Sequence, residues 1–271
     1  CIIGGYHGNY HTNKRNHDLA IGTKEGGDII ILGGCGPMGL GAVSYGIQYR
    51  NKPKRIVVTD IDDAKIARAR EVIPEETAAK KGVELLYVNT AKMADPVKEL
   101  RDITGGKGYD DVFVYVPNRA VAEMGDQLLG FDGCMNFFAG PTDNQFKAEI
   151  NLYNCHYTSS HIMGTTGGNN DDLIEANDLA AKKAIEPAVM VTHVGGIDSI
   201  VDATLNLPKI PGGKKLTYTQ FDMPLTAIED FGKLGETDPL FKKLDEACRK
   251  NRGLWNAEAE RILFEHFGVE V

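Results

Sequence analysis

The sequence predicts an α/β protein in which helices cover both faces of a doubly wound parallel sheet, followed by a mostly helical C-terminal extension. Short β-branched apolar runs alternate with stretches of helical period along the chain. Two of these runs, residues 29–32 and 55–59, have the composition of strands that are buried on both faces. Strands and helices that alternate at this spacing form right-handed crossovers and a parallel sheet.

The first strand leads into a glycine-rich turn, Gly34–Gly39, which reads GCGPMG and has the spacing G-x-G-x-x-G. In Rossmann folds, which bind dinucleotides, Gly34 would permit the tight turn, Gly36 would let the backbone reach a pyrophosphate, and Gly39 would let the helix approach the sheet. Pro37 suits the first helical position because its missing N–H costs nothing there. A helix that begins here would present free N–H groups to a phosphate.

Asp60 ends the second strand, about 20 residues after the third glycine, where a dinucleotide fold places the carboxylate that binds the adenosine ribose. The alternative is a glycine-rich turn followed by an acid that caps the next helix. The order strand, glycines, helix, strand and acid favours the cofactor site. A carboxylate at this position would repel a 2′-phosphate, so NAD is predicted rather than NADP. Three cations that follow, Lys65, Arg68 and Arg70, leave NADP open.

The remaining elements follow in order along the chain. Helices are predicted over residues 37–49, 62–73, 75–81, 95–104, 119–129, 171–185, 197–207, 238–249 and 257–267. Strands are predicted over residues 83–89, 112–116, 134–139, 161–166 (an edge strand) and 214–220. Trp255, between the last two helices, is predicted to be a packing anchor. Since ligands bind at the carboxyl ends of parallel strands, Asp60, Val116–Pro117 and Ala139–Pro141 should border one crevice.

Composition narrows the class of protein. The formal charge is −8, with 42% hydrophobic and 25% charged residues, and this shows no electrostatic footprint for a nucleic-acid partner. No apolar run approaches the length of a membrane span, so a cytoplasmic protein without membrane contact is expected. The cysteines form no C-x-x-C pair, so they predict neither a disulfide framework nor a zinc site; they are Cys1, Cys35, Cys134, Cys155 and Cys248.

Two N-terminal histidines are four residues apart. On a helix, His7 and His11 would share one face as a metal-binding pair does. No carboxylate or cysteine nearby in the sequence completes such a site. A solvated or capping role is therefore predicted for both imidazoles.

Taken together, residues 25–220 resemble the nucleotide-binding part of the zinc-type medium-chain alcohol and polyol dehydrogenases. The resemblance depends on several motifs in the order of the family: Lys24–Asp28, Gly34–Leu40, Val58–Ile61, Asp95–Val97, Thr104–Gly108 and Val191–His193. The Gly212–Lys215 turn and the tail after Phe221 are most similar to the sugar-phosphate branch, to which the L-sorbose 1-phosphate reductases belong.

The resemblance implies roles for particular residues. The backbone of four residues would hold the pyrophosphate: Gly36, Pro37, Met38 and Gly39. Asp60 and Lys65 would hold the adenosine ribose, and three residues would approach the nicotinamide: Val116, Ala139 and Thr166. His193 lies in a position typical of the family, and a structural role is expected for it.

The resemblance also implies a division of the chain. Residues 1–27 would connect to an N-terminal catalytic domain outside this sequence, 28–190 would bind the dinucleotide, 191–220 would return toward the catalytic domain, and 221–271 would form the helical extension. The zinc and the catalytic residues would lie only in that N-terminal domain, so this chain alone would bind cofactor and catalyse nothing.

The complete protein would interconvert a secondary alcohol, a polyol or sugar phosphate such as sorbose 1-phosphate or glucitol 6-phosphate, and a ketone. Zinc would act as the Lewis acid while hydride moves to or from the nicotinamide. A homo-oligomer, a dimer or a tetramer, is expected to form through the edge strand at 159–166.

Two other functions remain open. An S-adenosylmethionine-dependent methyltransferase also has a glycine-rich turn and an acid after the second strand. It would usually carry an acid just before the glycines, where this chain has Ile31–Gly33. A non-catalytic dinucleotide sensor is the second alternative, because a sensor needs no catalytic group.

Overall fold

The computed structural model describes residues 1–12 and 16–270. It divides into two compact units, Cys1–Glu186 and Pro187–Val271. The predicted α/β class is confirmed by the first unit, and the predicted helical C-terminal part by the second. The four-part division of the chain at residues 27, 190 and 220 stays a prediction.

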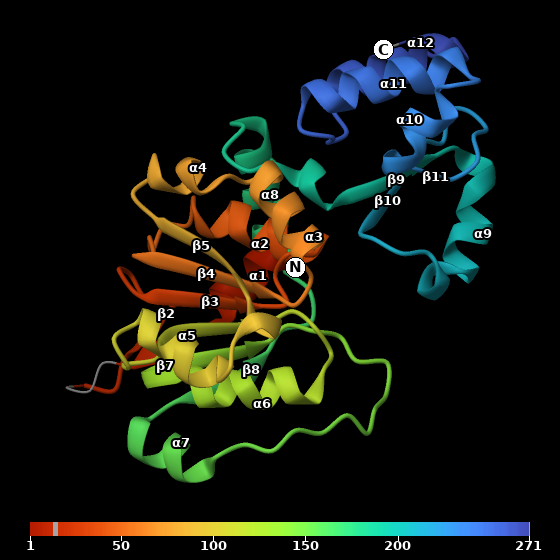
Figure 1. Ribbon diagram of the computed structural model, residues 1–271. Coiled ribbons are helices and arrows are strands. Elements are labelled where there is room, and N and C mark those ends of the chain that lie inside the picture. Colours follow the sequence, from red (N-terminus) through yellow and green to blue (C-terminus); the bar gives the residue numbers. More distant parts are fainter. Residues whose placement is uncertain (13–15, 271) are drawn as a thin grey trace. The chain divides into compact units, whose positions relative to one another are not determined.

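Within residues 1–12 and 16–186, six parallel strands form the central sheet in the order β5-β4-β3-β6-β7-β8 (Figure 1). Their bounds are β3 Asp28–Leu32, β4 Arg55–Asp60, β5 Glu84–Asn89, β6 Tyr109–Val114, β7 Leu129–Phe137 and β8 His161–Gly164. Strands β4 and β5 are added in turn on one side of β3. The chain then crosses back, and β6, β7 and β8 are added on the other side of β3. This reversal between β3 and β6 is the topological switch point of a doubly wound sheet.

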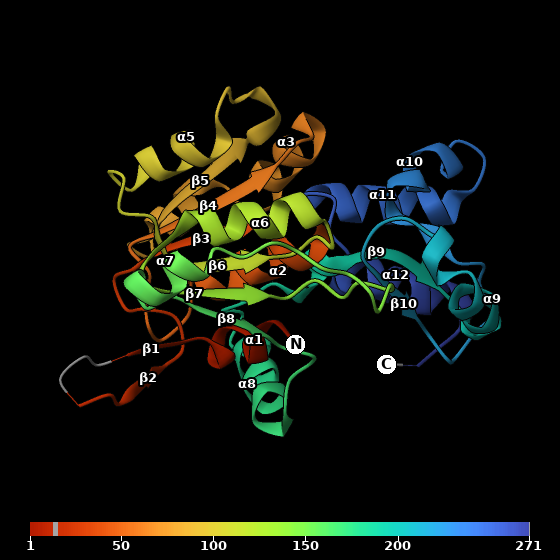
Figure 2. The same cartoon turned by 90° about the horizontal axis from the view of Figure 1, so that it is seen from below.

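Helices cover both faces of this sheet (Figure 2). On one face Leu100 of α5 (Pro96–Ile103) and Leu128 of α6 (Arg119–Leu128) pack against apolar residues of β3, β4 and β6. On the other face Tyr6 of α1 (Ile2–Gly8) stacks on Phe113 of β6, with ring centroids 4.8 Å apart. The strand residues between the two layers are almost wholly buried, as the apolar runs predicted.

The helices begin where the sequence supplies caps. Pro37 is the first residue of α2 (Pro37–Gly46), Asp62 caps α3 (Asp63–Val72), and Asp95 caps α5. Asn169 and Asp172 form a reciprocal capping box at the start of α8 (Asn170–Ala181). The short elements are α4 Glu75–Ala79, α7 Leu152–Thr158 and the 3₁₀ turn η1 Thr90–Lys92.

Several predicted boundaries are wrong. The helix expected to reach residue 185 ends at Ala181, because Lys183 takes a left-handed conformation with φ of 53°. Strand β7 begins at Leu129 rather than at residue 134. Its first residues include two glycines and Asp132, and because these residue types have low strand propensity, the sequence did not indicate a strand there. The helix α7 was not predicted.

The N-terminal segment contains α1 and a two-stranded antiparallel ribbon, β1 (Tyr10–Thr12) with β2 (Leu19–Ile21), none of which was predicted. The solvated or capping role expected for the two histidines is wrong. His11 is buried, with Nε2 3.3 Å from both carboxylate oxygens of Asp111 and Nδ1 2.9 Å from the carbonyl oxygen of Asp132. Nδ1 of His7 lies 2.7 Å from Oδ1 of Asp172. These partners are distant in sequence, so local spacing could not reveal them.

The second unit has its own core. Its sheet has the order β10-β9-β11, with β9 Val191–Gly195, β10 Lys214–Thr217 and β11 Thr226–Ala227 among the residues described up to 270. Its helices are α9 Ile200–Leu205, α10 Phe231–Leu234, α11 Pro239–Lys250 and α12 Ala257–Phe267, and its 3₁₀ turns are η2 Pro187–Met190, η3 Ile197–Ser199, η4 Leu207–Lys209 and η5 Ile228–Asp230. Trp255 is buried and donates to the Tyr218 hydroxyl at 2.9 Å, which confirms its role as a packing anchor.

Candidate cofactor-binding site

The carboxyl ends of the strands lie together at one edge of the sheet. In the register of the sheet, Leu32 of β3 lies opposite Thr59 of β4 and Val114 of β6, and Val114 lies opposite Phe137 of β7. Phe137 lies in turn opposite Gly164 at the end of β8. The chain segments that follow these strands therefore leave at the same edge. The ten residues predicted to bind cofactor lie at the end of β4 or in the segments that follow these five strands: Gly34, Gly36, Pro37, Met38, Gly39, Asp60, Lys65, Val116, Ala139 and Thr166.

The glycine turn is built by close backbone approach. The N–H of Gly34 donates to the carbonyl oxygen of Thr59 at 2.9 Å, which ties the turn to β4. A Cβ atom at Gly39 would collide with the backbone of Gly34, so the first turn of α2 lies directly on the loop. Only glycine allows this approach.

The N-terminus of α2 is open to an anion. Its N-cap is Gly36, which supplies no side-chain cap, and its first residue is Pro37. A Cβ atom at Gly36 would meet nothing within 4 Å. The first N–H groups of a helix have no partner within the helix, and the helix dipole favours negative charge at this end, so an anion at this open terminus would be stabilised.

Asp60 is the last residue of β4 and its carboxylate is held by the backbone. Oδ1 accepts from the N–H groups of Ile61 at 2.8 Å and Asp62 at 3.2 Å. Within the part of the chain that the structure describes, Oδ2 has no hydrogen bond. The cap of the next helix is Asp62, which accepts from Ala64 and Lys65. The alternative role for Asp60 as the helix cap is thus wrong, and its second oxygen is available to a ligand.

The cations that follow Asp60 differ in their partners. Nη1 of Arg68 lies 2.8 Å from Oε2 of Glu71, and Nε of Arg70 lies 2.8 Å from Oε1 of Glu75. Lys65 is exposed in the first turn of α3 and has no ion pair among the described residues. Of the three cations, only Lys65 lacks an ion pair among the described residues, so it is the one that can interact with a ligand at this end of the site.

Cys35, inside the glycine turn, is an inert thiol. It is buried, and burial together with the charge of Asp60 raises its pKa to about 12. The positive charges of Arg70 and Lys65 act in the opposite direction and lower the pKa of Cys35, but they do not outweigh burial. A neutral thiol at this point leaves the turn without added negative charge beside the anion position.

The other end of the site is bordered by residues that follow β6, β7 and β8. Val116 packs on Gly33, the residue just before the glycine turn, because a Cβ atom there would lie 2.5 Å from its Cγ1. Ala139 is held by a hydrogen bond from its N–H to the carbonyl oxygen of Val114 at 2.9 Å. Thr166 follows β8 and is exposed.

Sequence reasoning missed Tyr115. Its ring stacks on Phe138 with centroids 4.5 Å apart, and its hydroxyl is buried without a hydrogen-bond partner among the described residues. Burial raises the pKa of Tyr115, so the hydroxyl is neutral. An orphaned hydroxyl cannot be inferred from a strand pattern, because it depends on which atoms surround it.

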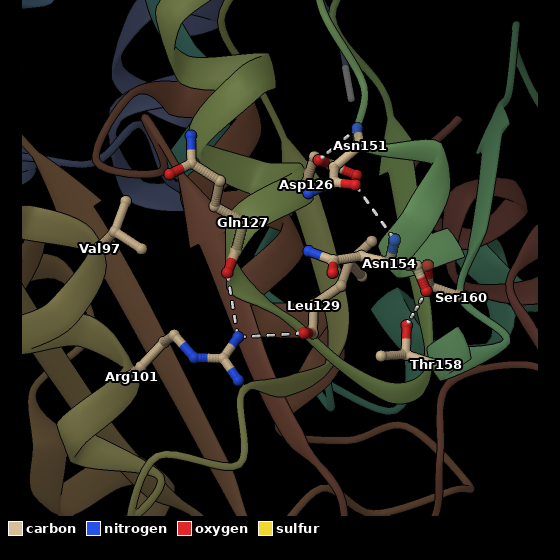
Figure 3. A pocket seen from close by; sticks show the side chains of 9 residues that line it. All are labelled: Val97, Arg101, Asp126, Gln127, Leu129, Asn151, Asn154, Thr158 and Ser160. Atoms are coloured by element: carbon tan, nitrogen blue, oxygen red, sulfur yellow. Dashed lines mark hydrogen bonds between the residues drawn. The ribbon is translucent and has the colours of Figure 1, made fainter. Parts of the chain in front are cut away.

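A pocket of about 440 Å³ lies at the amino ends of β7 and β8, the edge opposite the glycine turn (Figure 3). Arg101 donates there to the carbonyl oxygens of Gln127 and Leu129, and Asp126 accepts from the N–H of Asn151. None of the predicted cofactor residues lines this pocket. Its polar groups largely bind one another, so it adds nothing to the cofactor site.

Two absences hold for residues 1–12 and 16–270. No group of three or more His, Cys, Asp or Glu side chains in this range could hold a metal ion. No helix in this range is long and apolar enough to cross a membrane.

The zinc-binding dehydrogenase family model matches residues 37–182, more than half of the chain. The chain belongs to this family. It is 52% identical to the uncharacterized protein YggP of Escherichia coli K12 and 49% identical to mannitol-1-phosphate 5-dehydrogenase of Aliivibrio fischeri, each over 100% of this chain and 64% of the relative. It is 38% identical to L-sorbose 1-phosphate reductase of Klebsiella pneumoniae over 98% of this chain and 62% of that protein. The chain thus spans less than two thirds of the length of these relatives.

Solved structures of alcohol dehydrogenases share the fold. A zinc-binding-domain alcohol dehydrogenase from Burkholderia ambifaria superposes with a TM-score of 0.59 at 19% identity, over 82% of this chain and 53% of that one. A protein from E. coli CFT073 described as a short chain alcohol dehydrogenase, solved with NADH, superposes with a TM-score of 0.53 at 15% identity, over 72% of this chain and 52% of that one. These likenesses establish the fold, in agreement with the sheet order.

Proposed function

We propose that this chain is the NAD(H)-binding part of a dehydrogenase that interconverts a secondary alcohol of a polyol or sugar phosphate and the matching ketone. The observation that carries the proposal is the pairing of an open helix N-terminus at Gly36 with the free carboxylate oxygen of Asp60. The first fits a pyrophosphate and the second fits ribose hydroxyls, and both lie at the carboxyl edge of the sheet.

The names of the relatives support the reaction and the substrate class. Two of them are named for the oxidation or reduction of a hexitol phosphate or a ketose phosphate. Sorbose 1-phosphate, glucitol 6-phosphate and mannitol 1-phosphate are therefore the substrates to test first. The structural neighbour solved with NADH supports the cofactor.

Each end of the site has a distinct task. The N–H groups of Met38 and Gly39 would donate to the pyrophosphate, and Asp60 would accept hydrogen bonds from the adenosine ribose. Val116, Ala139 and Thr166 would enclose the nicotinamide and exclude water from it. The nicotinamide, when bound, supplies or takes up the hydride.

The same geometry supports NAD over NADP. A 2′-phosphate on the adenosine ribose would lie against the Asp60 carboxylate, where like charges repel. Arg68 and Arg70 are engaged by Glu71 and Glu75, so they offer little compensation. Lys65 is the one cation of the three left to attract the phosphate.

Zinc and the catalytic residues are proposed to lie in the part of the relatives that this chain does not cover. Zinc as Lewis acid would polarise the substrate oxygen there. On this proposal the chain binds cofactor by itself and turns over no substrate. The test is an assay of the chain with NADH and fructose or sorbose phosphates; measurable turnover would contradict it.

Cofactor binding is tested by titrating the chain with NADH and NADPH, following nicotinamide fluorescence and the thermal midpoint. Saturable NADH binding with much weaker NADPH binding is expected. S-adenosylmethionine serves as the control, because a response to it alone would favour the methyltransferase alternative and reject the dinucleotide site.

Self-association through β8 is also proposed. This strand pairs with β7 on one side, and Ile162 on it is 42% exposed. An open strand edge can pair with its own copy around a two-fold axis to form a dimer, and dimers can associate into tetramers. Light scattering after gel filtration should give a multiple of 29.5 kDa for the chain, and Ile162→Lys should return it to the monomer. A monomer in both would exclude this interface.

A further inference from the structure

Helix α1 lies directly on the segment that follows β8. A Cβ atom at Gly8 would lie 2.8 Å from Cγ2 of Thr165 and 2.9 Å from Cε of Met163. A Cβ atom at Gly4 would lie 2.9 Å from the carbonyl oxygen of Gly167. The glycines of α1 therefore let the helix approach side chains at the end of β8 and, at Gly4, the backbone of the loop beyond it.

A buried polar side chain joins the same two parts. Asn136 lies in β7 and is wholly buried among apolar strand residues. Its Nδ2 donates to the carbonyl oxygen of Gly5 at 3.0 Å and to Oδ1 of Asn9 at 3.1 Å. Its Oδ1 accepts from the Thr165 hydroxyl at 3.4 Å. A buried amide with every group engaged fixes one arrangement of its neighbours.

The far end of the loop is fixed by the same helix. Nδ1 of His7 in α1 lies 2.7 Å from Oδ1 of Asp172, the residue of α8 that also accepts from the N–H of Asn169 at 2.8 Å. The loop from Thr165 to Asn169 is thus held at its start through Asn136 and at its end through His7. Both constraints involve α1.

We propose that α1 and Asn136 are positioning elements for the nicotinamide end of the cofactor, acting through Thr165 on Thr166. The inference rests on the proposed NAD(H) site, in which Thr166 approaches the nicotinamide. Thr165 is restrained on its methyl side by Gly8 and on its hydroxyl side by Asn136, so the backbone that leads into Thr166 has little freedom. The adenosine end, built on β3, α2 and β4, uses neither contact; α1 meets it elsewhere, where the Tyr6 hydroxyl donates to the carbonyl oxygen of Ala42 in α2 at 2.9 Å.

The test compares two ligands that differ only in the nicotinamide. NADH fills both ends of the site, whereas ADP-ribose fills only the pyrophosphate and adenosine end. Gly8→Ala drives a methyl group against Cγ2 of Thr165. It should weaken NADH binding about tenfold while ADP-ribose affinity changes by less than about twofold.

A compensating substitution separates positioning from general damage. Thr165→Ser removes the Cγ2 atom that the new methyl group would meet, and Cε of Met163, at the far end of a flexible side chain, can move aside. The double variant Gly8→Ala/Thr165→Ser should therefore recover NADH affinity to within about twofold of the wild type. Gly164→Ala is the matched control, because its Cβ would lie at an ordinary 3.5 Å from the carbonyl oxygen of Phe137.

The outcomes are distinct. Equal weakening of NADH and ADP-ribose by Gly8→Ala, or a double variant no better than the single one, would overturn the inference. If Gly8→Ala does not fold, Thr165→Val decides, since it keeps the shape and removes the hydroxyl. An unchanged ratio of the two affinities in Thr165→Val would then overturn it. Wild-type protein that binds neither ligand would reject the proposed function itself.

Discussion

The two ends of the cofactor site are built in different ways. The adenosine end is made by one continuous stretch, from the glycine turn through α2 to Asp60 at the end of β4. The nicotinamide end is assembled from segments after three strands and is supported by α1, whose His7 meets Asp172 across more than half the chain. The first end depends on local backbone geometry, and the second depends on long-range contacts. Substitutions should therefore act differently at each.

The largest effect is expected at Gly39. A Cβ atom there would collide with the backbone of Gly34, which cannot move aside as a flexible side chain could. Gly39→Ala should lower stability by about 2 kcal/mol and weaken NADH binding at least about a hundredfold. Thermal unfolding and fluorescence titration measure the two effects.

Gly36→Ala is the matched variant for that experiment. Its Cβ would meet no protein atom within 4 Å, so folding stability should be unchanged while NADH binding is still lost to the new methyl group. Loss of stability in both variants would mean that the turn is a folding element and not a phosphate cradle.

The long-range contacts should make stability depend on pH. Burial lowers the pKa of His11, but its hydrogen bond to Asp111 and the charges of Asp111 and Asp132 outweigh burial and raise it. Because the folded-state pKa of His11 lies above the unfolded value of about 6.5, the interactions of the protonated imidazole stabilise the fold fully at pH values below that unfolded value. This stabilisation is lost as the pH rises through the folded-state pKa.

His11→Gln should remove this dependence, and should lower stability by about 2 kcal/mol at pH 6, because the buried Asp111 carboxylate loses a charged partner. Denaturant unfolding at pH 6 and pH 8 measures both. His17→Gln, at an exposed residue, is the control. A wild-type stability that rises from pH 6 to pH 8 relative to His11→Gln would refute a raised pKa for His11 in the folded state.

Asp60 tests the adenosine end without disturbing the fold. Its Oδ2 has no protein partner in the described chain, so Asp60→Asn should leave stability within about 0.5 kcal/mol of the wild type. NADH affinity should fall about tenfold, and the preference for NADH over NADPH should narrow. Asp63→Asn, an exposed acid paired with Lys92, should change neither affinity.

The contrast between the two ends also explains what the sequence could predict. The turn Gly34–Gly39 and Asp60 were recognisable because their chemistry depends on spacing within one strand-turn-helix-strand unit. Asn136 lies in an apolar strand, and nothing in its neighbours indicates that it meets Gly5 and Thr165. The buried setting of His11 was missed for the same reason, since Asp111 and Asp132 reach it only after folding.

Lys65 should give the smallest effect at the site. It is exposed on the first turn of α3 and would interact with the ribose or pyrophosphate across solvent, where such contacts contribute about 0.5 kcal/mol. Lys65→Gln should therefore weaken NADH binding only about twofold in low salt, and by less in 0.5 M salt, because screening already weakens the interaction. NADPH should lose more than NADH if Lys65 attracts the 2′-phosphate. Titrations of both cofactors at two salt concentrations measure this. If NADH and NADPH lose affinity equally, and the loss does not depend on salt, Lys65 acts through the helix and not through its charge.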